Sequence, residues 1–188
     1  ITAWNCRGLG NGPTVRGLLD LQKQVDPDVL FLSETKMSEN RMTWFKSVMG
    51  MSSMIVRDCE GKSGGLALLW KRHVKVELHN YSKYHVDVQI IEEDGFKWRF
   101  TGIYGEPTAD KKERTWRLMR ILNQQMKLPW LCAGDFNEVL YGHEKKGGPP
   151  RSQKHMEKFR MALVECGLRD LGFTGDKFTW RNNSHQAD

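Results

Sequence analysis

The stretch "WLCAGDFNEVL", which runs from Trp130 to Leu140, ends an apolar segment with an acid and an amide. Mostly apolar residues lead into Gly134, and Asp135 and Asn137 follow two residues apart. A short apolar run that is bounded by glycine predicts a buried strand. The strand would therefore end by presenting a carboxylate and a carboxamide at one edge of a sheet.

Two other apolar runs end in the same way. "ITAW" leads into Asn5, and "VLFLS" leads into Glu34. In α/β sheets, ligands gather at the carboxyl ends of strands, and oxygen ligands of this kind suit a hard cation such as Mg²⁺. Each end could instead be structural, with Asp135 capping a turn and Asn137 bonding local backbone. Three strand ends with one pattern favour a functional site.

The remaining segments predict one layered α/β domain over residues 1–188. Four runs predict strands ("GGLALLW", "VKVELHN", "HVDVQII" and "KWRFTGIY"), and several of them alternate at period two, which suggests antiparallel pairing. Asp94-Gly95 predicts a hairpin turn between the last two. Helical spacing predicts helices over 13–25, from Ser38, over 108–127 and from Ser152, with the two serines as caps. "DKFTW" is expected to form a last strand.

Composition excludes several classes of protein. The chain has 188 residues, of which 39% are hydrophobic, which is too apolar for a disordered protein. No apolar run approaches the roughly 20 residues of a membrane helix, and no secretory signal opens the sequence. The four cysteines are far apart, so reduced packing cysteines of an intracellular protein are expected. A net charge of +6 favours polyanionic partners, though only weakly.

The first segment also invites a competing interpretation. A strand, the glycines of "GLGNG", a helix and then Glu34 imitate a dinucleotide-binding unit. However, Pro13 stands where the third glycine of that motif is expected, and the antiparallel strands fit that fold poorly. The metal site is therefore the preferred hypothesis.

Five segments carry a resemblance to a known family. "WNCRGL", "FLSETK", "SGGLALLW", "GIYGEP" and "CAGDFNE" come in the order and spacing of the endonuclease/exonuclease/phosphatase superfamily, the DNase I-like fold. Each motif is weak alone, but five in order are specific. With "EKKGG" and "GDKFTW", the chain looks most like the endonuclease domain of plant LINE-type (non-LTR) retrotransposons, and the resemblance spans essentially its whole length.

The resemblance implies a four-layered α/β sandwich of two mixed β-sheets flanked by helices, and Mg²⁺-dependent hydrolysis of phosphodiesters, with Mn²⁺ as an alternative ion. It implies Glu34 as the main metal ligand, with Asn5 helping to build the metal and phosphate site. Asp135 would handle the proton of the water or of the leaving oxygen, and Asn137 would orient it. Tyr104 would contact the scissile phosphate.

Further residues are expected to contact DNA. The resemblance places Thr179 near the phosphate. A basic segment follows the catalytic strand, and its nearness in sequence to Asp135 favours phosphate contacts from Lys145, Lys146, Arg151 and Lys154. A second basic group, on the expected helix over 108–127, is as consistent with a solvated helix face as with DNA contact.

The chain departs from the family at its C-terminal end. The Ser-Asp-His motif that ends the family's domain, and the acid before it, are not found here, and none of the six histidines stands in that context. We therefore expect a truncated domain that is nearly inactive and poorly stable on its own.

The intact parent is expected to be an intracellular, nuclear DNA-nicking enzyme that carries a reverse transcriptase domain in the same polypeptide and has no membrane partner. The alternatives are a phosphatase of the same superfamily and a non-catalytic remnant that binds nucleic acid.

Overall fold

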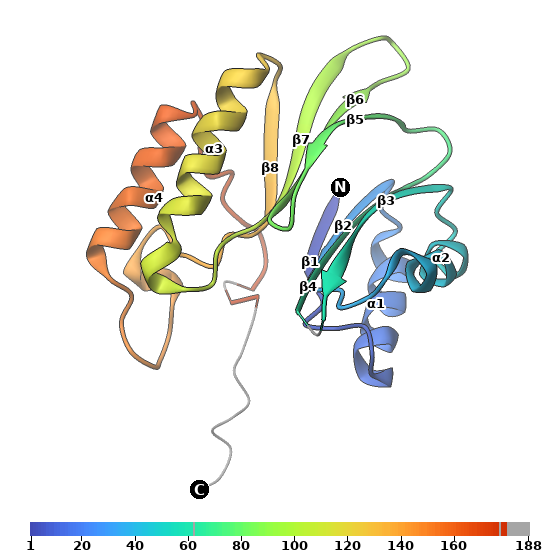
Figure 1. Ribbon diagram of the computed structural model, residues 1–188, viewed down its shortest axis with the longest axis horizontal. Helices are drawn as coiled ribbons and strands as arrows, with labels where there is room; N and C mark the ends of the chain where they lie inside the picture. The colour runs from blue at the N-terminus through green and yellow to red at the C-terminus, as the bar shows by residue number, and fades with distance from the viewer. Residues whose placement is uncertain (62, 177, 180–188) are drawn as a thin grey trace, which may run out of the picture. The chain divides into compact units, whose positions relative to one another are not determined.

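The computed structural model of the chain describes residues 1–61, 63–176, 178 and 179 (Figure 1). The chain divides into two compact units. One comprises residues 1–107 and 126–137, and the other comprises residues 108–125 and those from 138 onward. The two units are described separately below.

The first unit contains two four-stranded sheets. The first sheet has the order β1-β2-β4-β3, with β1 over Thr2–Asn5, β2 over Val29–Ser33, β3 over Ser53–Glu60 and β4 over Ser63–Trp70. The strands β1 and β2 run parallel, whereas the β2–β4 and β3–β4 pairs are antiparallel.

The second sheet follows the order of the chain. It consists of β5 (Lys75–Tyr81), β6 (His85–Ile91), β7 (Lys97–Tyr104) and β8 (Trp130–Asp135). The first three strands pair antiparallel, as their alternating pattern predicts, and β8 joins β7 in parallel. Both sheets are therefore mixed, and each contains one parallel pair.

The sides of β2 show how the layers of this unit are built. Leu30 and Leu32 pack in one buried cluster with residues of α1 (Gly12–Val25) and α2 (Glu39–Val48). The alternate residues Val29 and Phe31 pack in a second cluster with residues of β6 and β7. Because successive side chains of a strand point to opposite faces, one sheet lies between the two helices and the other sheet (Figure 1).

Phe31 fixes the contact between the sheets. Its ring lies edge-on to Phe100 of β7, with centroids 6.2 Å apart. A Cβ atom on Gly102 would lie 2.3 Å from the same ring. The sheets approach this closely only because residue 102 has no side chain.

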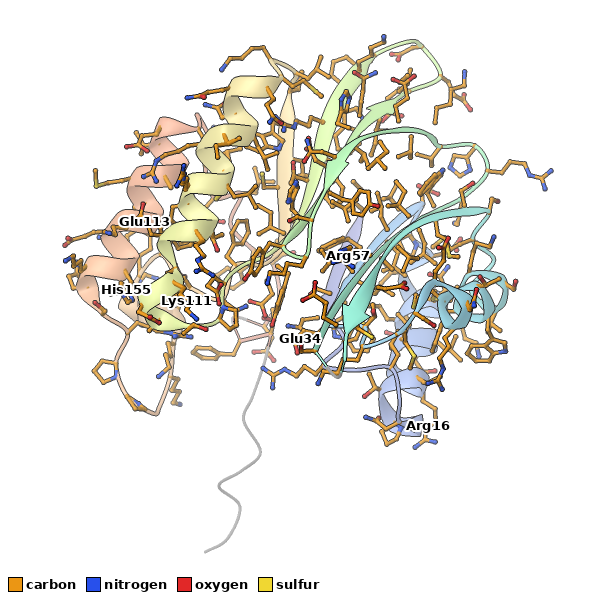
Figure 2. All side chains as sticks on the ribbon, viewed as in Figure 1. Arg16, Glu34, Arg57, Lys111, Glu113 and His155 are labelled. Atoms are coloured by element: carbon orange, nitrogen blue, oxygen red, sulfur yellow. The ribbon has the colours of Figure 1, made fainter. Side chains whose placement is uncertain are left out.

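The second unit is built on two helices, α3 (Glu113–Gln125) and α4 (Gln153–Glu165), with short 3₁₀ turns at Ala109–Lys111 and Gly142–Glu144. Trp116 of α3 stacks on Phe159 of α4 with ring centroids 4.4 Å apart. Glu113, labelled in Figure 2, accepts from Lys158 of α4 at 2.7 Å. Apolar stacking and ion pairing together hold this helix pair.

The predicted fold class, two mixed β-sheets flanked by helices, is confirmed. The hairpin at Asp94-Gly95 is confirmed as well. The strand β3 was not predicted, and Ser38 and Ser152 take the cap positions without a side-chain capping bond. The expected strand at 176–180 is wrong where the chain is described, because Asp176, Phe178 and Thr179 are not in a strand; residues 177 and 180 lie outside the described part.

No helix in the described part of the chain is both long and apolar enough to cross a membrane.

Buried polar groups brace the second sheet. Asp87 of β6 accepts from Arg99 at 2.7 and 2.8 Å and from the hydroxyl of Thr101 at 2.6 Å. The Thr101 oxygen in turn accepts from the indole of Trp130 on β8 at 2.8 Å. These hydrogen bonds join β6, β7 and β8. They also satisfy the buried charges of Asp87 and Arg99.

His85, at the start of β6, joins this network as a neutral ring through Asn80, whose side-chain amide donates to Asp87 at 3.4 Å. Its Nε2 faces the side-chain amide oxygen of Asn80, Oδ1, which only accepts, so Nε2 carries the proton. Its Nδ1 lies 2.8 Å from the hydroxyl of Ser82 and accepts from it. Burial lowers the pKa of His85, with Arg99 lowering it and Asp87 opposing the shift.

We predict that protonation of His85 lowers the free energy of unfolding as the pH falls. Its pKa in the folded chain lies below the ordinary 6.5, so the unfolded chain binds more protons. The contribution is complete above about pH 6.5 and is lost as the pH falls toward the folded-state value, by at most about 1.4 kcal/mol per pH unit.

Denaturant unfolding at about pH 7.5 and about pH 5 measures this loss. His85→Gln should reduce it, whereas His79→Gln, at an exposed histidine of β5, should not. Equal pH dependence in the two variants would contradict the assignment.

Candidate functional site

The side chain of Asn5 joins two carboxylates at the end of the sheets. Its Nδ2 donates to Glu34 Oε1 and to Asp135 Oδ2, each at 2.8 Å. Its Oδ1 accepts from the backbone N–H of Arg7 at 3.0 Å, which fixes the orientation of the amide. One amide group thus ties the end of β1 to the end of β8, and so one sheet to the other.

Strand register explains why these residues meet. Asn5 pairs with Ser33 in the parallel β1–β2 ladder, so Glu34 follows directly after its neighbour. Tyr104 pairs with Asp135 in the parallel β7–β8 ladder. Figure 2 shows Glu34 near the ends of the strands, away from their middle. The structure thus brings together Asn5, Glu34 and Asp135, and their roles in a site stay predictions.

The backbone turns sharply after three of these strands. Arg7, Glu34, Lys36 and Asn137 all have left-handed φ angles, between 52° and 55°. Such angles cost a side-chain-bearing residue on the order of 1 kcal/mol, and they persist where the surrounding structure holds them. The concentration of this strain at one edge of the sheets is typical of a functional site.

Tyr104 is a protonated donor at this edge. Burial raises the pKa of its phenol above the usual range, and the neighbouring negative charge of Glu34, with a hydrogen bond to it, raises that pKa further. Asp135 adds to the shift, and a hydrogen bond with Asn137 opposes it. The hydroxyl therefore keeps its proton at physiological pH and can act as a donor to an anionic oxygen.

Asn137 closes the end of β8. Its backbone N–H donates to Asp135 Oδ1 at 2.8 Å, and its Nδ2 donates to the carbonyl of Gly105 at 2.7 Å. The turn cap by Asp135, which the sequence left open as a structural alternative, is therefore present, whereas the side chain of Asn137 bonds a backbone carbonyl that is distant in sequence. Both oxygens of Asp135 accept hydrogen bonds, so its orientation is fixed before any ligand arrives.

Two glycines allow β7 and β8 to approach this closely. A Cβ atom on Gly134 would lie 2.0 Å from the carbonyl oxygen of Ile103. A Cβ atom on Gly105 would lie 2.2 Å from the carbonyl oxygen of Phe136, and the N–H of Gly105 donates to the Asp135 carbonyl at 2.7 Å. Sequence reasoning used Gly134 only as the boundary of a strand and did not single out Gly105, although each lies within a motif that it quoted.

The donor set is of the kind that binds a divalent cation. Glu34 and Asp135 supply two carboxylates at hydrogen-bond distance from one amide. No cluster of three acidic, histidine or cysteine side chains suited to a metal occurs among the described residues. Mg²⁺ usually binds through one or two carboxylates and keeps several waters, so two carboxylates are compatible with such an ion. Asn5 stays a predicted ligand, through the oxygen that also accepts from Arg7.

Cys6 is close to the site but does not take part as a nucleophile. Burial, and to a lesser extent the charge of Glu34, raises the pKa of its thiol to about 12. The thiolate, which is the reactive form, is therefore not populated near neutral pH.

The predicted DNA-contacting residues belong to the second unit. Lys146, Lys154 and Thr179 are exposed. The ammonium of Lys145 donates to the carbonyl of Gly147 at 2.8 Å and also to that of Pro149, so it closes its own loop. Their contact with phosphate stays a prediction.

Glu138, the residue after Asn137, is a charged group that sequence reasoning missed. Its side chain is fully buried in the second unit, with Arg151 at 3.7 Å and Lys112 and His155 at 3.9 Å. These contacts connect the end of "GDFNE" with the start of α3 and with α4. Arg151, expected on phosphate, thus lies beside a buried acid.

The family model described as the endonuclease/exonuclease/phosphatase family matches residues 2–187. No curated protein matches the chain.

Solved structures show the same fold. A structure of the AP endonuclease LMAP from Leishmania major matches with a TM-score of 0.66 and 13% identity, over 88% of this chain and 65% of that one. The endonuclease domain of TRAS1, a telomere-specific non-LTR retrotransposon, matches with 0.65 and 15%, over 92% and 74%.

The 3′ phosphatase NExo from Neisseria, bound to a product DNA hairpin, matches with a TM-score of 0.64 and 16% identity, over 87% of this chain and 69% of that one. The chain thus spans less than two thirds of the length of the Leishmania major AP endonuclease, at 65%. These likenesses confirm the predicted DNase I-like fold.

We predict that Gly105→Ala loosens the junction of β7 and β8. The new methyl group would meet backbone atoms of Phe136, which cannot move aside without shifting Asp135 or Asn137. Overpacking of this kind costs about 1–3 kcal/mol. Gly10→Ala, at a glycine with nothing within 4 Å of the added carbon, is the matched control. Denaturant unfolding should separate the two variants, and equal midpoints would show that the close contact is not required.

Proposed function

Since this chain belongs to the endonuclease/exonuclease/phosphatase family, we propose that it forms the catalytic part of a Mg²⁺-dependent endonuclease that nicks DNA. One observation supports this above the others. The amide of Asn5 holds the carboxylates of Glu34 and Asp135 together at the strand ends, at 2.8 Å each. Two carboxylates that lie close together in a partly buried position repel one another, so a bound cation would stabilise their charged forms.

Tyr104 and Asp135 have separate roles in the proposed phosphodiester hydrolysis. In such a reaction, negative charge builds up on the oxygens of a five-coordinate phosphorus. Tyr104 offers a protonated phenol to a phosphate oxygen. Asp135, held by Asn5 and by the N–H of Asn137, is the acid/base group that exchanges a proton with the water or the leaving oxygen.

Glu34, with Asn5 beside it, would hold the magnesium ion. When bound, the ion supplies electrostatic stabilisation of the developing charge on the phosphate oxygens. Mn²⁺ would serve in the same role. The left-handed backbone of Glu34 turns its carboxylate away from the strand, toward the edge where the other groups lie.

DNA is the proposed substrate, and a retrotransposon is the proposed origin. The net charge of +6 and the exposed Lys146 and Lys154 suit a polyanion. The order of the motifs, with "EKKGG", supports a LINE-type element of a plant, whose reverse transcriptase would follow in the same polypeptide. Such an enzyme would act in the nucleus, where its DNA target lies.

Glu34→Gln is expected to abolish Mg²⁺-dependent nicking in the full-length protein. The change removes the charge that holds the cation but keeps the shape and an acceptor for Asn5. Nicking of supercoiled plasmid should fall by about 10² or more, and calorimetry should show weaker Mg²⁺ binding. Glu93→Gln, at an exposed glutamate of the β6–β7 turn, should behave as the parent. A Glu34→Gln variant that nicks at the parent rate would remove Glu34 from the site.

Asp135→Asn is expected to slow turnover without loss of DNA binding. A positioned acid/base group contributes about 10²–10⁴-fold, and an amide cannot exchange the proton. Affinity should persist because a negative charge near phosphate is lost. Asp20→Asn, at an exposed aspartate of α1, is the control. Parallel loss of affinity and rate would assign Asp135 a structural role instead.

The same assays distinguish the other activities of the family. Release of inorganic phosphate from a 3′-phosphorylated oligonucleotide, with no plasmid nicking, would make the protein a phosphatase. DNA binding without either reaction would make it a non-catalytic nucleic-acid-binding protein.

A further inference from the structure

A phenol and a buried carboxylate lie next to the site without belonging to its predicted residues. The hydroxyl of Tyr84 donates to Glu106 Oε2 at 2.7 Å. Glu106 is only 5% exposed, although it follows Tyr104 by two residues at the end of β7. A buried carboxylate is costly unless donors hold it, so a phenol at this distance is a strong partner.

Tyr84 holds this segment at two points. Besides the bond from its side chain to Glu106, its backbone carbonyl accepts from the N–H of Tyr104 at 2.8 Å. The first contact holds the segment after β7, and the second holds the residue that faces Glu34. Residues 104–106 are therefore fixed at both ends by one tyrosine from the neighbouring turn.

Tyr84 is itself a fixed point. Its N–H donates to the hydroxyl of Ser82 at 3.1 Å, and that hydroxyl lies 2.8 Å from the Nδ1 atom of the buried His85. The N–H of Ser82 donates to the carbonyl of His85 at 2.9 Å, which closes the turn before β6. The anchor of the segment is thus held by the hydrogen bonds of the turn before β6.

The segment in turn sets the positions of the catalytic groups. The N–H of Gly105 donates to the backbone carbonyl of Asp135, and the carbonyl of Gly105 accepts from the side chain of Asn137, each at 2.7 Å. Because Gly105 and Phe136 are in close contact, the ends of β7 and β8 cannot shift independently of one another. A displacement of residues 104–106 would therefore reach Tyr104, Asp135 and Asn137 together.

We propose that Tyr84 and Glu106 are positioning residues that lock the Tyr104–Gly105 segment against the end of β8. Neither residue reacts. Their bond sets the distance between the Tyr104 phenol and the Asp135 carboxylate, and a displacement of about 1 Å in such an arrangement can cost about 100-fold in rate. The catalytic consequence rests on the proposed function, whereas the locking of the segment does not.

Tyr84→Phe is the direct test, in the full-length protein. The change removes the hydroxyl that reaches Glu106 and keeps the ring and the backbone carbonyl. Tyr81→Phe makes the same change at an exposed tyrosine of β5 and is the matched control.

Two readouts are measured. Hydrogen–deuterium exchange followed by mass spectrometry should speed up about tenfold in the peptide that spans residues 104–106 of Tyr84→Phe, and should stay unchanged over β2 and β6. Plasmid nicking should show kcat lowered about ten- to a hundredfold, with DNA affinity within about twofold of the parent.

Several outcomes would overturn the proposal. Exchange in Tyr84→Phe that equals that of Tyr81→Phe would show that the bond locks nothing. Exchange that rises over the whole chain would make the pair an ordinary contributor to stability, and a local rise with unchanged kcat would remove the catalytic role. A parent protein that does not nick DNA refutes the proposed function instead, and the exchange experiment then decides the locking by itself.

Discussion

The amide of Asn5 lies between two carboxylates that would otherwise repel one another. Glu34 and Asp135 come from different sheets, and each receives one N–H of the same side chain at 2.8 Å. The amide can do this only because its oxygen is held by the N–H of Arg7, which leaves both N–H groups free to point at the acids. The site therefore exists where β1 and β8 meet, and it depends on the packing of the two sheets.

That packing rests on small residues and on register. Phe31 fills the space that the absent side chain of Gly102 leaves, which sets the separation of the sheets. The parallel β7–β8 ladder then places Tyr104 opposite Asp135. A slip of one residue would turn either side chain to the opposite face, so the chemistry is specified by the same pattern that specifies the core.

Sequence alone identified most of this arrangement, for a physical reason. A polar residue that ends an apolar strand shows in the pattern, and Asn5, Glu34 and Asp135 were found in this way. Tyr104 needed the family resemblance, because a tyrosine at a strand end is also a common core residue. The strand β3 was missed because its "SMIVRDCE" has no regular alternation, and its partner β4 organises it. Contacts between distant residues, such as Tyr84 with Glu106, leave no local signal.

The central claim is that the strand ends hold one divalent cation at the carboxylate of Glu34. Anomalous diffraction from a crystal of the protein soaked in Mn²⁺ tests it most directly, because the ion itself is located. The account predicts a peak at coordination distance from the Glu34 carboxylate, beside Asn5 and Asp135. A soaked crystal with no peak there, or with its ion bound at other residues while nicking activity is intact, would contradict it.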